Sequence, residues 1–474
     1  MSKYDYNIIV IGGGAAGLVS SYIASATNAK VALIEKHKMG GDCLNTGCVP
    51  SKALIRSAKI LHDTKNAQKF GFNSSEIDFD FSDVMERVQE IIKKIEPHDS
   101  MERYRKLGVD CIEGEAKIIS PHTVKVNGKI ISTRSIIVAT GAKPLVPPIE
   151  GLEHIDYLTS DNLWHLKELP KKLVVLGGGP IGVEMAQSFA RFGSKVTIVE
   201  MAPQILIRED EEVINSITQY FEEDNIEVLT NHKAKSFDGN KLICDNNNDE
   251  VEIEFDKIII ALGRKPNISG FGLDKLGIKI RKQGTIEANQ FLQTNISNIY
   301  VCGDVTGPYQ FTHTAAHQAW YASVNALFAP FKKFKVDYRV IPWTTFTDPE
   351  IARVGINEKE AIEQNIAYEV TKYDISDLDR AITEGEDKGF IKVLTVPKKD
   401  KILGVTIVGS HAGDIISEYI LAMKYGLGLK KILGTIHIYP TLAESNKYAA
   451  GNWQKNHKPE MILSILKKFH SWRR

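Results

Sequence analysis

The amino-acid sequence predicts an α/β fold with two dinucleotide-binding domains of the Rossmann type. Two glycine-rich turns each follow an apolar strand and precede a helix, with the sequences Gly12-x-Gly14-x-x-Gly17 and Gly177-x-Gly179-x-x-Gly182. An acidic residue, Glu35 or Glu200, lies 23 positions after the first glycine of each turn. One such turn is weak support, but two with matching flanks and spacing indicate two nucleotide sites.

Each turn belongs to a repeated unit of strand, helix and strand. In the first unit we expect strands at residues 7–11 and 31–34 and a helix up to about residue 27; in the second, strands at 173–176 and 195–199 and a helix up to about residue 192. A later apolar strand ends in a glycine turn in both copies, which indicates an internal duplication. The first two glycines of each turn allow a pyrophosphate to approach the backbone, and the acid accepts ribose hydroxyls.

Cys43 and Cys48 follow directly after the first unit. Five positions apart on a regular helix, two Cα atoms are about 8 to 9 Å apart, whereas a disulfide needs roughly 4.4 to 6.8 Å. A regular helix therefore cannot join the two cysteines. Gly47 supplies backbone freedom where the chain must tighten, before Pro50 enters a helix at residues 51–60. Beside a nucleotide turn, the pair predicts an accessible, easily reduced disulfide next to a flavin.

Length and composition limit the functional classes. The 474 residues exceed one hydrophobic core and suit two to four domains. Lys plus Arg and Asp plus Glu both number 59, so nothing favours nucleic acid or a strongly anionic surface as a partner, and small molecules are expected. The five cysteines do not form a secreted disulfide framework. We expect no signal peptide, no membrane-spanning segment and a cytoplasmic location.

The last segment, residues 461–474, is amphipathic and basic. Such a segment can make loose contact with a membrane. We expect it instead to form a helix that packs on the body of the protein.

These residues closely resemble the flavin-dependent pyridine nucleotide:disulfide oxidoreductases, the family of dihydrolipoamide dehydrogenase, glutathione reductase and mercuric reductase. The resemblance covers nearly the whole chain. Besides the two glycine turns, it rests on Gly-Gly-Asp-Cys-Leu-Asn-Thr-Gly-Cys-Val-Pro-Ser-Lys at 40–52, Ala-Thr-Gly at 139–141, Ala-Leu-Gly-Arg-Lys-Pro-Asn at 261–267, Tyr-Val-Cys-Gly-Asp at 300–304 and Pro-Thr-Leu-Ala-Glu at 440–444.

The resemblance implies a division of labour along the chain. Residues 1–150 and 271–340 would form an FAD-binding domain, residues 151–270 an NAD(P)-binding domain, and residues 341–474 a C-terminal α+β dimerisation domain. A homodimer with a shared active site is implied, in which the cysteine pair of one subunit faces the segment around residue 440 of the other.

The resemblance also implies roles for single residues. Cys43 would exchange with substrate, Cys48 would lie next to the flavin, and Lys52 would pair with Glu184 beneath the flavin ring. Asp304 would hold the flavin ribitol. The implied cofactor-binding residues are Gly12, Gly14, Gly17, Glu35, Lys52, Gly114, Thr140, Gly141 and Asp304, together with Gly177, Gly179, Gly182, Glu184, Glu200, Gly263 and Arg264. Because a carboxylate at Glu200 binds a free 2′-hydroxyl and repels a 2′-phosphate, NADH is favoured over NADPH.

One position departs from the pattern of the relatives that act on lipoamide or glutathione. Where they have a histidine before Pro-Thr, this chain has Tyr439, and a phenol of pKa about 10 is no ready base at neutral pH. His437 could substitute as the base, and Glu444 would then pair with His437 or Tyr439. Tyr439 and residues 379–390 resemble the mercuric-reductase branch, although that branch carries a C-terminal cysteine pair and the last cysteine here is Cys302.

The expected function follows from the resemblance and this departure. The chain is expected to be an FAD-dependent oxidoreductase that passes electrons from NAD(P)H to the disulfide of Cys43 and Cys48, and on to an unassigned disulfide or other acceptor. The alternatives are dihydrolipoamide dehydrogenase, a mercuric-reductase-like metal reductase and a low-turnover redox sensor. His313 and His317 lie four positions apart on an expected helix, but no third ligand is near in sequence, so no metal site is expected.

Overall fold

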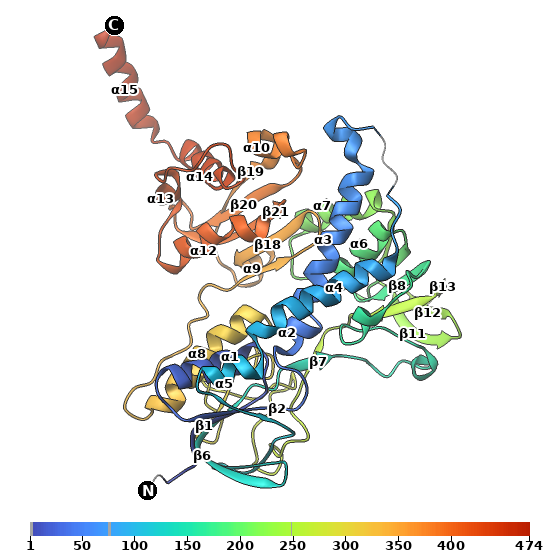
Figure 1. Cartoon of the computed structure of the whole chain (residues 1–474). Coiled ribbons are helices and arrows are strands. Elements are labelled where there is room, and N and C mark those ends of the chain that lie inside the picture. Colours follow the sequence, from blue (N-terminus) through green and yellow to red (C-terminus); the bar gives the residue numbers. More distant parts are fainter. Residues whose placement is uncertain (1–2, 74–76, 248) are drawn as a thin grey trace. The chain divides into compact units, whose positions relative to one another are not determined.

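The computed structural model describes residues 3–73, 77–247 and 249–474. It contains two compact units (Figure 1). The first comprises Met1–Lys65, Glu76–Pro203 and Leu229–Asp337, and the second comprises Asn66–Ser75, Gln204–Val228 and Tyr338–Arg474.

A parallel sheet forms the first half of the first unit. Its strand order is β3 (Asp110–Glu113), β2 (Val31–Glu35), β1 (Tyr6–Ile11) and β6 (Lys129–Val138), and β16 (Ile299–Val301) also pairs with β6. β4 (Lys117–Ser120) and β5 (Thr123–Val126) extend β6 as antiparallel strands. β16 therefore returns to this sheet from far along the chain, at the carboxyl edge where the glycine turn lies.

Both faces of this sheet are buried, which explains the continuous apolar runs of its strands. On one face, Ile8, Val10 and Leu33 pack against α1 (Ala15–Ala26) and α8 (Thr312–Phe328). α8 contributes alanines at 315, 319 and 322, small side chains at helical spacing that let α1 lie close beside it (Figure 1). Each large buried side chain stabilises the fold by about 1.5–3 kcal/mol relative to an exposed one.

The second half of the first unit repeats this plan. A four-stranded sheet has the order β10 (Ile226–Leu229), β9 (Lys195–Val199), β8 (Lys172–Leu176) and β14 (Lys257–Ile260), and α6 (Pro180–Phe192) follows its glycine turn. A three-stranded antiparallel sheet of β11 (Lys233–Asp238), β12 (Lys241–Asn246) and β13 (Asp249–Glu254) corresponds to the antiparallel part of the first half. The predicted duplication is visible in the topology.

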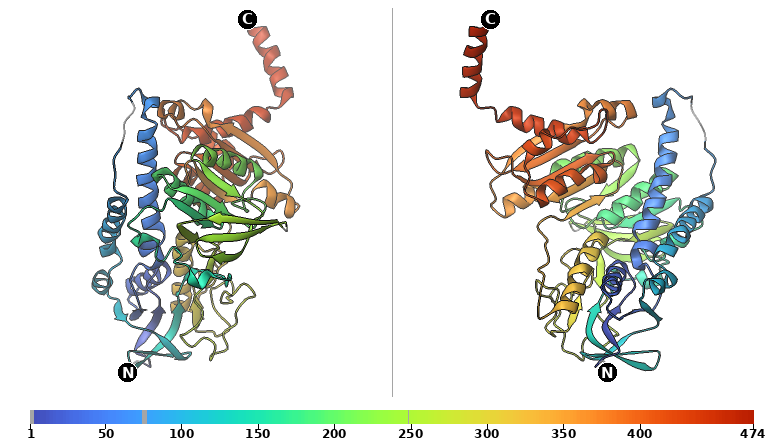
Figure 2. Two further views of the ribbon diagram at one scale, coloured as in Figure 1. Left: turned by 90° about the vertical axis from the view of Figure 1, so that its right-hand side faces the viewer. Right: turned by 60° about the vertical axis from the view of Figure 1, so that its left-hand side comes forward.

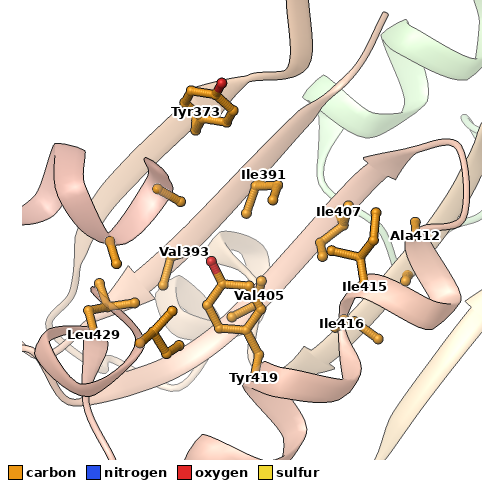
Figure 3. Packing of buried hydrophobic residues seen from close by; sticks show 14 of the residues in the cluster. Tyr373, Ile391, Val393, Val405, Ile407, Ala412, Ile415, Ile416, Tyr419 and Leu429 are labelled. Atoms are coloured by element: carbon orange, nitrogen blue, oxygen red, sulfur yellow. The ribbon is translucent and has the colours of Figure 1, made fainter. Parts of the chain in front are cut away.

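The second unit contains a five-stranded antiparallel sheet in the order β17 (Pro342–Thr345), β18 (Glu350–Gly355), β21 (Ile402–Gly409), β20 (Phe390–Thr395) and β19 (Glu369–Asp374). Figure 3 shows its core, where Ile391, Val393 and Val405 of the sheet meet Ile416 and Tyr419. The covering helices are α11 (Ala412–Ile415), α12 (Ser417–Lys424), α13 (Leu429–Leu433) and α14 (Glu444–Asn456). With this sheet the predicted fold class, two Rossmann-like domains and a C-terminal α+β domain, is confirmed.

The remaining elements connect these layers. The helices are α2 (Gly41–Asn45), α3 (Cys48–Lys65), α4 (Phe81–Ile95), α5 (Met101–Lys106), α7 (Glu211–Glu223), α9 (Glu358–Glu363), α10 (Asp379–Glu384) and α15 (Glu460–Arg473), and the 3-10 helices are η1 (Ala67–Phe70), η2 (Glu96–His98), η3 (Leu152–His154), η4 (Leu163–His165) and η5 (Ile375–Asp377). The strands β7 (Ala142–Pro144) and β15 (Arg264–Pro266) pair with each other. The domain boundaries at residues 150, 270 and 340 stay predictions.

The C-terminal segment corrects one expectation. Residues 460–473 are helical, as predicted, but α15 buries none of its residues, so it does not pack on the body of the protein (Figure 2). The chain leaves the core after α14, where Trp453 is buried and stacks on His457. Within the described residues, no helix combines the length and the apolar character needed to cross a bilayer.

Candidate active site

The two glycine turns are closed by the same contacts. A Cβ on Gly12 would come within 2.4 Å of the Ala139 carbonyl oxygen, and a Cβ on Gly177 within 2.5 Å of the Ala261 carbonyl oxygen. Both glycines have φ above 100°, which other residues rarely adopt. Ala139 and Ala261, which directly follow β6 and β14, therefore lie in close contact with the glycine turns. This close contact explains the small residues at the end of each of these strands.

The third glycine of each turn is required by packing inside the turn. A Cβ on Gly17 would come within 1.7 Å of the Gly12 carbonyl oxygen, and a Cβ on Gly182 within 2.0 Å of the Gly177 carbonyl oxygen. The middle glycines differ, because a Cβ on Gly179 would meet nothing within 4 Å. The middle position of the second turn is thus open toward a ligand rather than filled by protein.

The two acids brace the turns that precede them. Glu35 accepts hydrogen bonds from the backbone N–H groups of Gly13, at 2.5 Å, and His37, at 2.7 Å. Glu200 accepts the equivalent bonds from Gly178 and Ala202, each at 2.7 Å. The sequence predicts both acids as ribose acceptors, a role that stays a prediction; the structure adds that each carboxylate fixes its own glycine turn.

Hydrogen bonds join the Ala-Thr-Gly motif at 139–141 to Asn267. The Thr140 hydroxyl donates to the Asn267 carbonyl at 2.7 Å, the Asn267 amide donates to the Thr140 carbonyl at 2.9 Å, and the Asn267 N–H donates to the Gly141 carbonyl at 2.9 Å. Gly114, with φ +153°, donates its N–H to the Glu35 carbonyl at 2.8 Å. Asn267 is a residue that the sequence analysis quoted in a motif without giving it a role.

Arg264 turns toward two carboxylates of the first domain. Its guanidinium pairs with Asp42, lies 3.5 Å from Asp304 and donates to the Ala142 carbonyl at 2.8 Å. Gly263, just before it, has φ +110°. Burial raises the pKa of Asp304 to about 6 despite the opposing charge of Arg264. The contacts of Arg264 therefore lie beside the residue predicted to hold flavin, not at the second nucleotide turn, and Asp42 is a partner that the sequence analysis missed.

Lys52 and Glu184 form the predicted ion pair. The distance from Lys52 Nζ to Glu184 Oε2 is 2.9 Å, and the pair joins α3 to α6. Glu184 is buried whereas the Lys52 side chain keeps about a third of its exposure. Their position beneath a flavin ring stays a prediction.

The cysteine pair lies where two helices meet. α2 ends at Asn45 and α3 begins at Cys48, so Thr46 and Gly47 break the helix as the spacing of the cysteines requires. A Cβ on Gly47 would come within 2.9 Å of the Asp42 carbonyl oxygen, which holds the tight approach open only for glycine. α3 begins three residues earlier and ends five residues later than expected from residues 51–60. Both cysteines are thiols in this structure.

The two thiols differ in acidity. A hydrogen bond from Cys43 lowers the pKa of Cys48 to about 6, with further help from the Thr312 hydroxyl and the charge of Lys52. The same hydrogen bond, together with burial, raises the pKa of Cys43. Cys48 is the first residue of α3, where the helix dipole also favours a thiolate. At neutral pH the pair is therefore a Cys48 thiolate held by a Cys43 thiol.

Thr312 is a contact that the sequence analysis did not find. Its Oγ1 lies 3.3 Å from Cys48 Sγ, and it begins α8. The two residues are separated by 264 positions, so only the folded structure brings them together. His317, on the same helix, binds the Asp337 carbonyl at 3.0 Å.

The second unit places the predicted acid–base residues apart from one another. Tyr439 is exposed and its hydroxyl donates to Asp379 Oδ2 at 2.9 Å, an interaction that raises the pKa of the phenol. His437 contacts the Glu418 carboxylate at 3.1 Å through Nε2 and the Thr435 carbonyl at 3.1 Å through Nδ1. Both ring nitrogens of His437 are thus engaged within the unit.

The hydrogen bonds of Glu444 go to other groups than the predicted partners. Its carboxylate accepts from the Thr441 N–H at 3.3 Å, just before α14, and also bonds the Tyr448 hydroxyl. Its charge is one of the causes that raise the pKa of the Tyr439 phenol. The pairing of Glu444 with His437 or Tyr439 in catalysis stays a prediction.

Comparison with known proteins places the chain in a family. The profile of the pyridine nucleotide-disulphide oxidoreductases matches residues 6–319, and that of their dimerisation domain matches residues 341–450. The chain belongs to the pyridine nucleotide-disulphide oxidoreductases. It is 33% identical to a mercuric reductase of Staphylococcus aureus, over 95% of this chain and 83% of that protein. It is 34% identical to a dihydrolipoyl dehydrogenase of Chlamydia muridarum, over 93% and 95% respectively.

A solved structure agrees with this family. The HOCl-induced flavoprotein disulfide reductase RclA from Escherichia coli has a TM-score of 0.84 and 28% identity, and the match covers 94% of this chain and 99% of that one. As a pyridine nucleotide-disulphide oxidoreductase, this protein is a flavin-dependent enzyme that uses NAD(P)H and acts on sulfur groups. Its dimerisation domain indicates a homodimer.

The residues of the first domain fit the FAD that this family uses. At Gly12 and Gly17 the turn is so tight that a Cβ would meet backbone atoms. Gly303, which has φ +82°, directly precedes Asp304. Asp304 is a largely buried carboxylate whose pKa is raised by loss of water, and a hydrogen bond from a ligand hydroxyl would replace part of that lost hydration. These residues, with Lys52, would hold FAD.

Proposed function

We propose that this enzyme is an NADH-dependent disulfide reductase in which Cys48 is the inner thiolate and Cys43 the thiol that exchanges with the acceptor. The observation that carries the proposal is the opposite acidity of the two sulfurs, with the pKa of Cys48 lowered to about 6 and that of Cys43 raised. The surroundings of Cys48 support the same assignment independently of the shared hydrogen bond, because Cys48 begins α3 and lies beside the Thr312 hydroxyl and the Lys52 charge.

The electrons and protons balance over the cycle. When bound, FAD would accept the hydride of NADH and pass its two electrons and its proton on to the disulfide. Cys43 and Cys48 would then become a thiol and a thiolate without a further proton. The Cys43 thiol attacks an acceptor disulfide, and its proton goes to the acceptor thiol that leaves. The Cys48 thiolate attacks the mixed disulfide and restores the internal bond, and the second acceptor sulfur leaves as a thiolate that takes one proton from water.

Lys52 and Arg264 support these steps by their charges. The Lys52 ammonium, held at 2.9 Å by Glu184, favours negative charge near the thiolate and at the reduced ring. Arg264 pairs with Asp42 and Asp304 and so offsets part of the repulsion between the Asp304 carboxylate and the Cys48 thiolate, a repulsion that helps to raise the pKa of Asp304. We assign Lys52 and Arg264 positioning roles and Cys43 and Cys48 the catalytic ones.

Anaerobic titration with NADH tests the relay. We expect a long-wavelength charge-transfer absorbance after two electrons per flavin. Cys48→Ser removes this band, whereas Cys43→Ser shows it before any reduction because Cys48 is then a permanent thiolate. Cys111→Ser is the matched control, since a hydroxyl there keeps the contact with the Val109 carbonyl. Full flavin reduction without the band in the wild type contradicts the relay.

The preference for NADH rests on Glu200. Its carboxylate already accepts two backbone N–H groups and lies at the end of the second strand, where the ribose of the nucleotide is expected. The ratio of kcat/KM for NADH over NADPH should exceed one and fall in Glu200→Ser. Equal use of both nucleotides by the wild type contradicts this preference.

A metal ion is a second candidate acceptor. Three observations favour it: Tyr439 replaces the imidazole of the lipoamide-type relatives, several relatives are named mercuric reductase, and RclA has been solved as a Cu(II) complex. No cluster of three or more His, Cys, Asp or Glu residues within the described residues forms a separate metal site. The metal would therefore meet the cysteine pair itself. Turnover with Hg²⁺ or Cu²⁺ that is lost in Cys43→Ser, without turnover of any disulfide, would favour this candidate.

Dihydrolipoamide dehydrogenase activity requires a base that the structure does not offer within this chain. His437 is engaged by Glu418 and Thr435, and the pKa of Tyr439 is raised further from neutrality. We expect Tyr439→His to increase dihydrolipoamide turnover and His437→Ala to leave it unchanged. The shared active site, the cytoplasmic location and the alternative of a redox sensor stay predictions.

A further inference from the structure

The C-terminal helix α15 is the largest feature that the proposed function does not use. It spans 14 residues, Glu460–Arg473, and none of them is buried. Its exposed apolar side chains are Met461, Ile462, Leu463, Ile465, Leu466, Phe469 and Trp472. Isolated helices of this length are marginal in water, because most helical stability in proteins comes from covering an apolar face. A partner for that face is therefore required.

The side chains of α15 are sorted by face. Successive residues on a helix are 100° apart, which places Met461, Ile465 and Trp472 together with Ile462, Leu466 and Phe469 in one continuous apolar arc. Glu460, Ser464, Lys467 and Ser471 lie on the opposite side. Lys468 borders the arc on the side of Met461, whereas Arg473 lies within the arc between Ile462 and Leu466. The Arg473 guanidinium lies 5.5 Å from the centre of the Phe469 ring.

Residues 455–474 are strongly basic, although the whole chain has no net charge. Residues 455–474 contain one acidic side chain, Glu460, against the basic side chains of Lys455, Lys458, Lys467, Lys468, Arg473 and Arg474. Long basic side chains at the edges of an apolar arc can reach outward while the arc is covered by nonpolar material. An anionic surface with an apolar interior complements both features at once.

We propose that α15 binds the surface of an anionic phospholipid bilayer and lies in its plane. At 1.5 Å per residue its 14 residues extend about 21 Å, shorter than the roughly 30 Å hydrocarbon core, so it cannot span. It also lies beyond residue 450, where the family's dimerisation profile ends, so the fold does not need it as a core element. A homodimer presents two such helices, and two weak anchors together hold far better than one.

A second copy of the same helix is the other occupant to exclude. Pairing two α15 helices through their apolar arcs would bring Lys468, at one edge of the arc, and Arg473, within it, from both copies into one interface. Like charges at such positions oppose association. An anionic bilayer turns the same charges into attraction, and this is why we favour it.

Vesicle flotation of the purified flavin-containing protein tests the proposal. Vesicles of phosphatidylglycerol and phosphatidylcholine in equal parts should bind the wild type at least about tenfold more strongly than vesicles of phosphatidylcholine alone. Added salt should weaken the binding. Lys468→Glu with Arg473→Glu should reduce it by about tenfold or more, since each basic residue near such a surface contributes about fivefold.

Two further variants separate the apolar arc from the charges. Ile465→Asn with Phe469→Asn removes the apolar centre of the arc without changing any charge and should abolish flotation. Ser464→Asn with Ser471→Asn changes the opposite face and should leave flotation unchanged. NADH oxidation with a soluble acceptor should be the same for all variants, which shows that each one is folded and carries flavin.

Three results would overturn the proposal. One is equal binding of the wild type to neutral and anionic vesicles, and another is no binding to either. The third is a tetramer of the wild type, measured by light scattering without vesicles, that Ile465→Asn with Phe469→Asn converts to a dimer. The last result would assign the face to a second copy of this chain.

Discussion

Replacing Thr312 by valine should raise the pKa of the Cys48 thiol. Valine has nearly the shape of threonine but no hydroxyl, so the change removes the contact between Oγ1 and Cys48 Sγ, which lie 3.3 Å apart. A hydroxyl donor stabilises the thiolate more than the thiol, and the pKa of Cys48, about 6, is lowered partly for that reason. Loss of the donor therefore shifts the equilibrium toward the thiol.

The size of the shift follows from the exposure of Cys48. Hydrogen bonds to charged groups contribute about 1.5–3 kcal/mol when shielded from water. Cys48 is exposed, so water replaces part of the lost bond and about 1 kcal/mol remains. That corresponds to about 0.7 pKa unit. From about 6 the pKa would rise to about 7, and the thiolate fraction at pH 7 would fall from about nine tenths to about a half to two thirds.

The assay is a pH titration of the two-electron-reduced enzyme under anaerobic conditions. The long-wavelength absorbance reports the Cys48 thiolate, and the rate of alkylation by iodoacetamide gives an independent curve. Thr312→Ser is the matched control because it keeps the hydroxyl at the first position of α8. The reasoning is refuted if the midpoint in Thr312→Val stays at the wild-type value or falls, or if Thr312→Ser shifts it equally.

Three other perturbations separate the parts of the site. Gly182→Ala forces a Cβ to 2.0 Å from the Gly177 carbonyl oxygen and should cost about 2 kcal/mol or more of unfolding free energy, whereas Gly179→Ala meets nothing within 4 Å and should leave denaturant unfolding unchanged while raising KM for NADH. The pKa of Asp304 is about 6 in the folded protein against 3.8 for a free carboxyl, so the folded state binds a proton at a higher pH than the unfolded state does. The unfolding free energy of the flavin-free wild type should therefore rise relative to that of Asp304→Asn as the pH falls through about 6. Parallel plots of unfolding free energy against pH for the two proteins would contradict this. Lys52→Met leaves the buried Glu184 carboxylate without its cation and should lower the melting temperature, and adding Glu184→Gln should recover part of the loss.

The fold was predictable because its signals are local. The apolar run at residues 7–11, the glycines at fixed offsets and the acid 23 positions later all lie within one strand, turn and strand, and β1, α1 and β2 form close to the expected bounds. α3 begins earlier than expected, at Cys48 instead of Ser51, because the break at Thr46 and Gly47 already frees the chain to start a new helix.

The parts that sequence reasoning missed or misassigned depend on contacts between distant residues. The Arg264 guanidinium reaches Asp42 across 222 positions, and the Thr312 hydroxyl reaches Cys48 across 264. No periodicity or spacing encodes such a meeting. The hydrogen bond of Glu444 is local instead, since its carboxylate accepts from the Thr441 N–H three positions earlier in the chain.

The two halves of the first unit share one design and differ at the middle glycine of the turn. In the first copy a Cβ on Gly41 would come within 2.7 Å of Gly14 Cα, so the segment that carries the cysteines closes over the first turn. In the second copy Gly179 faces open space. The contact between Gly41 and Gly14 fixes the start of α2, and hence Cys43, against the first turn. If that turn holds FAD, as we expect, the same short segment places the thiols beside the cofactor.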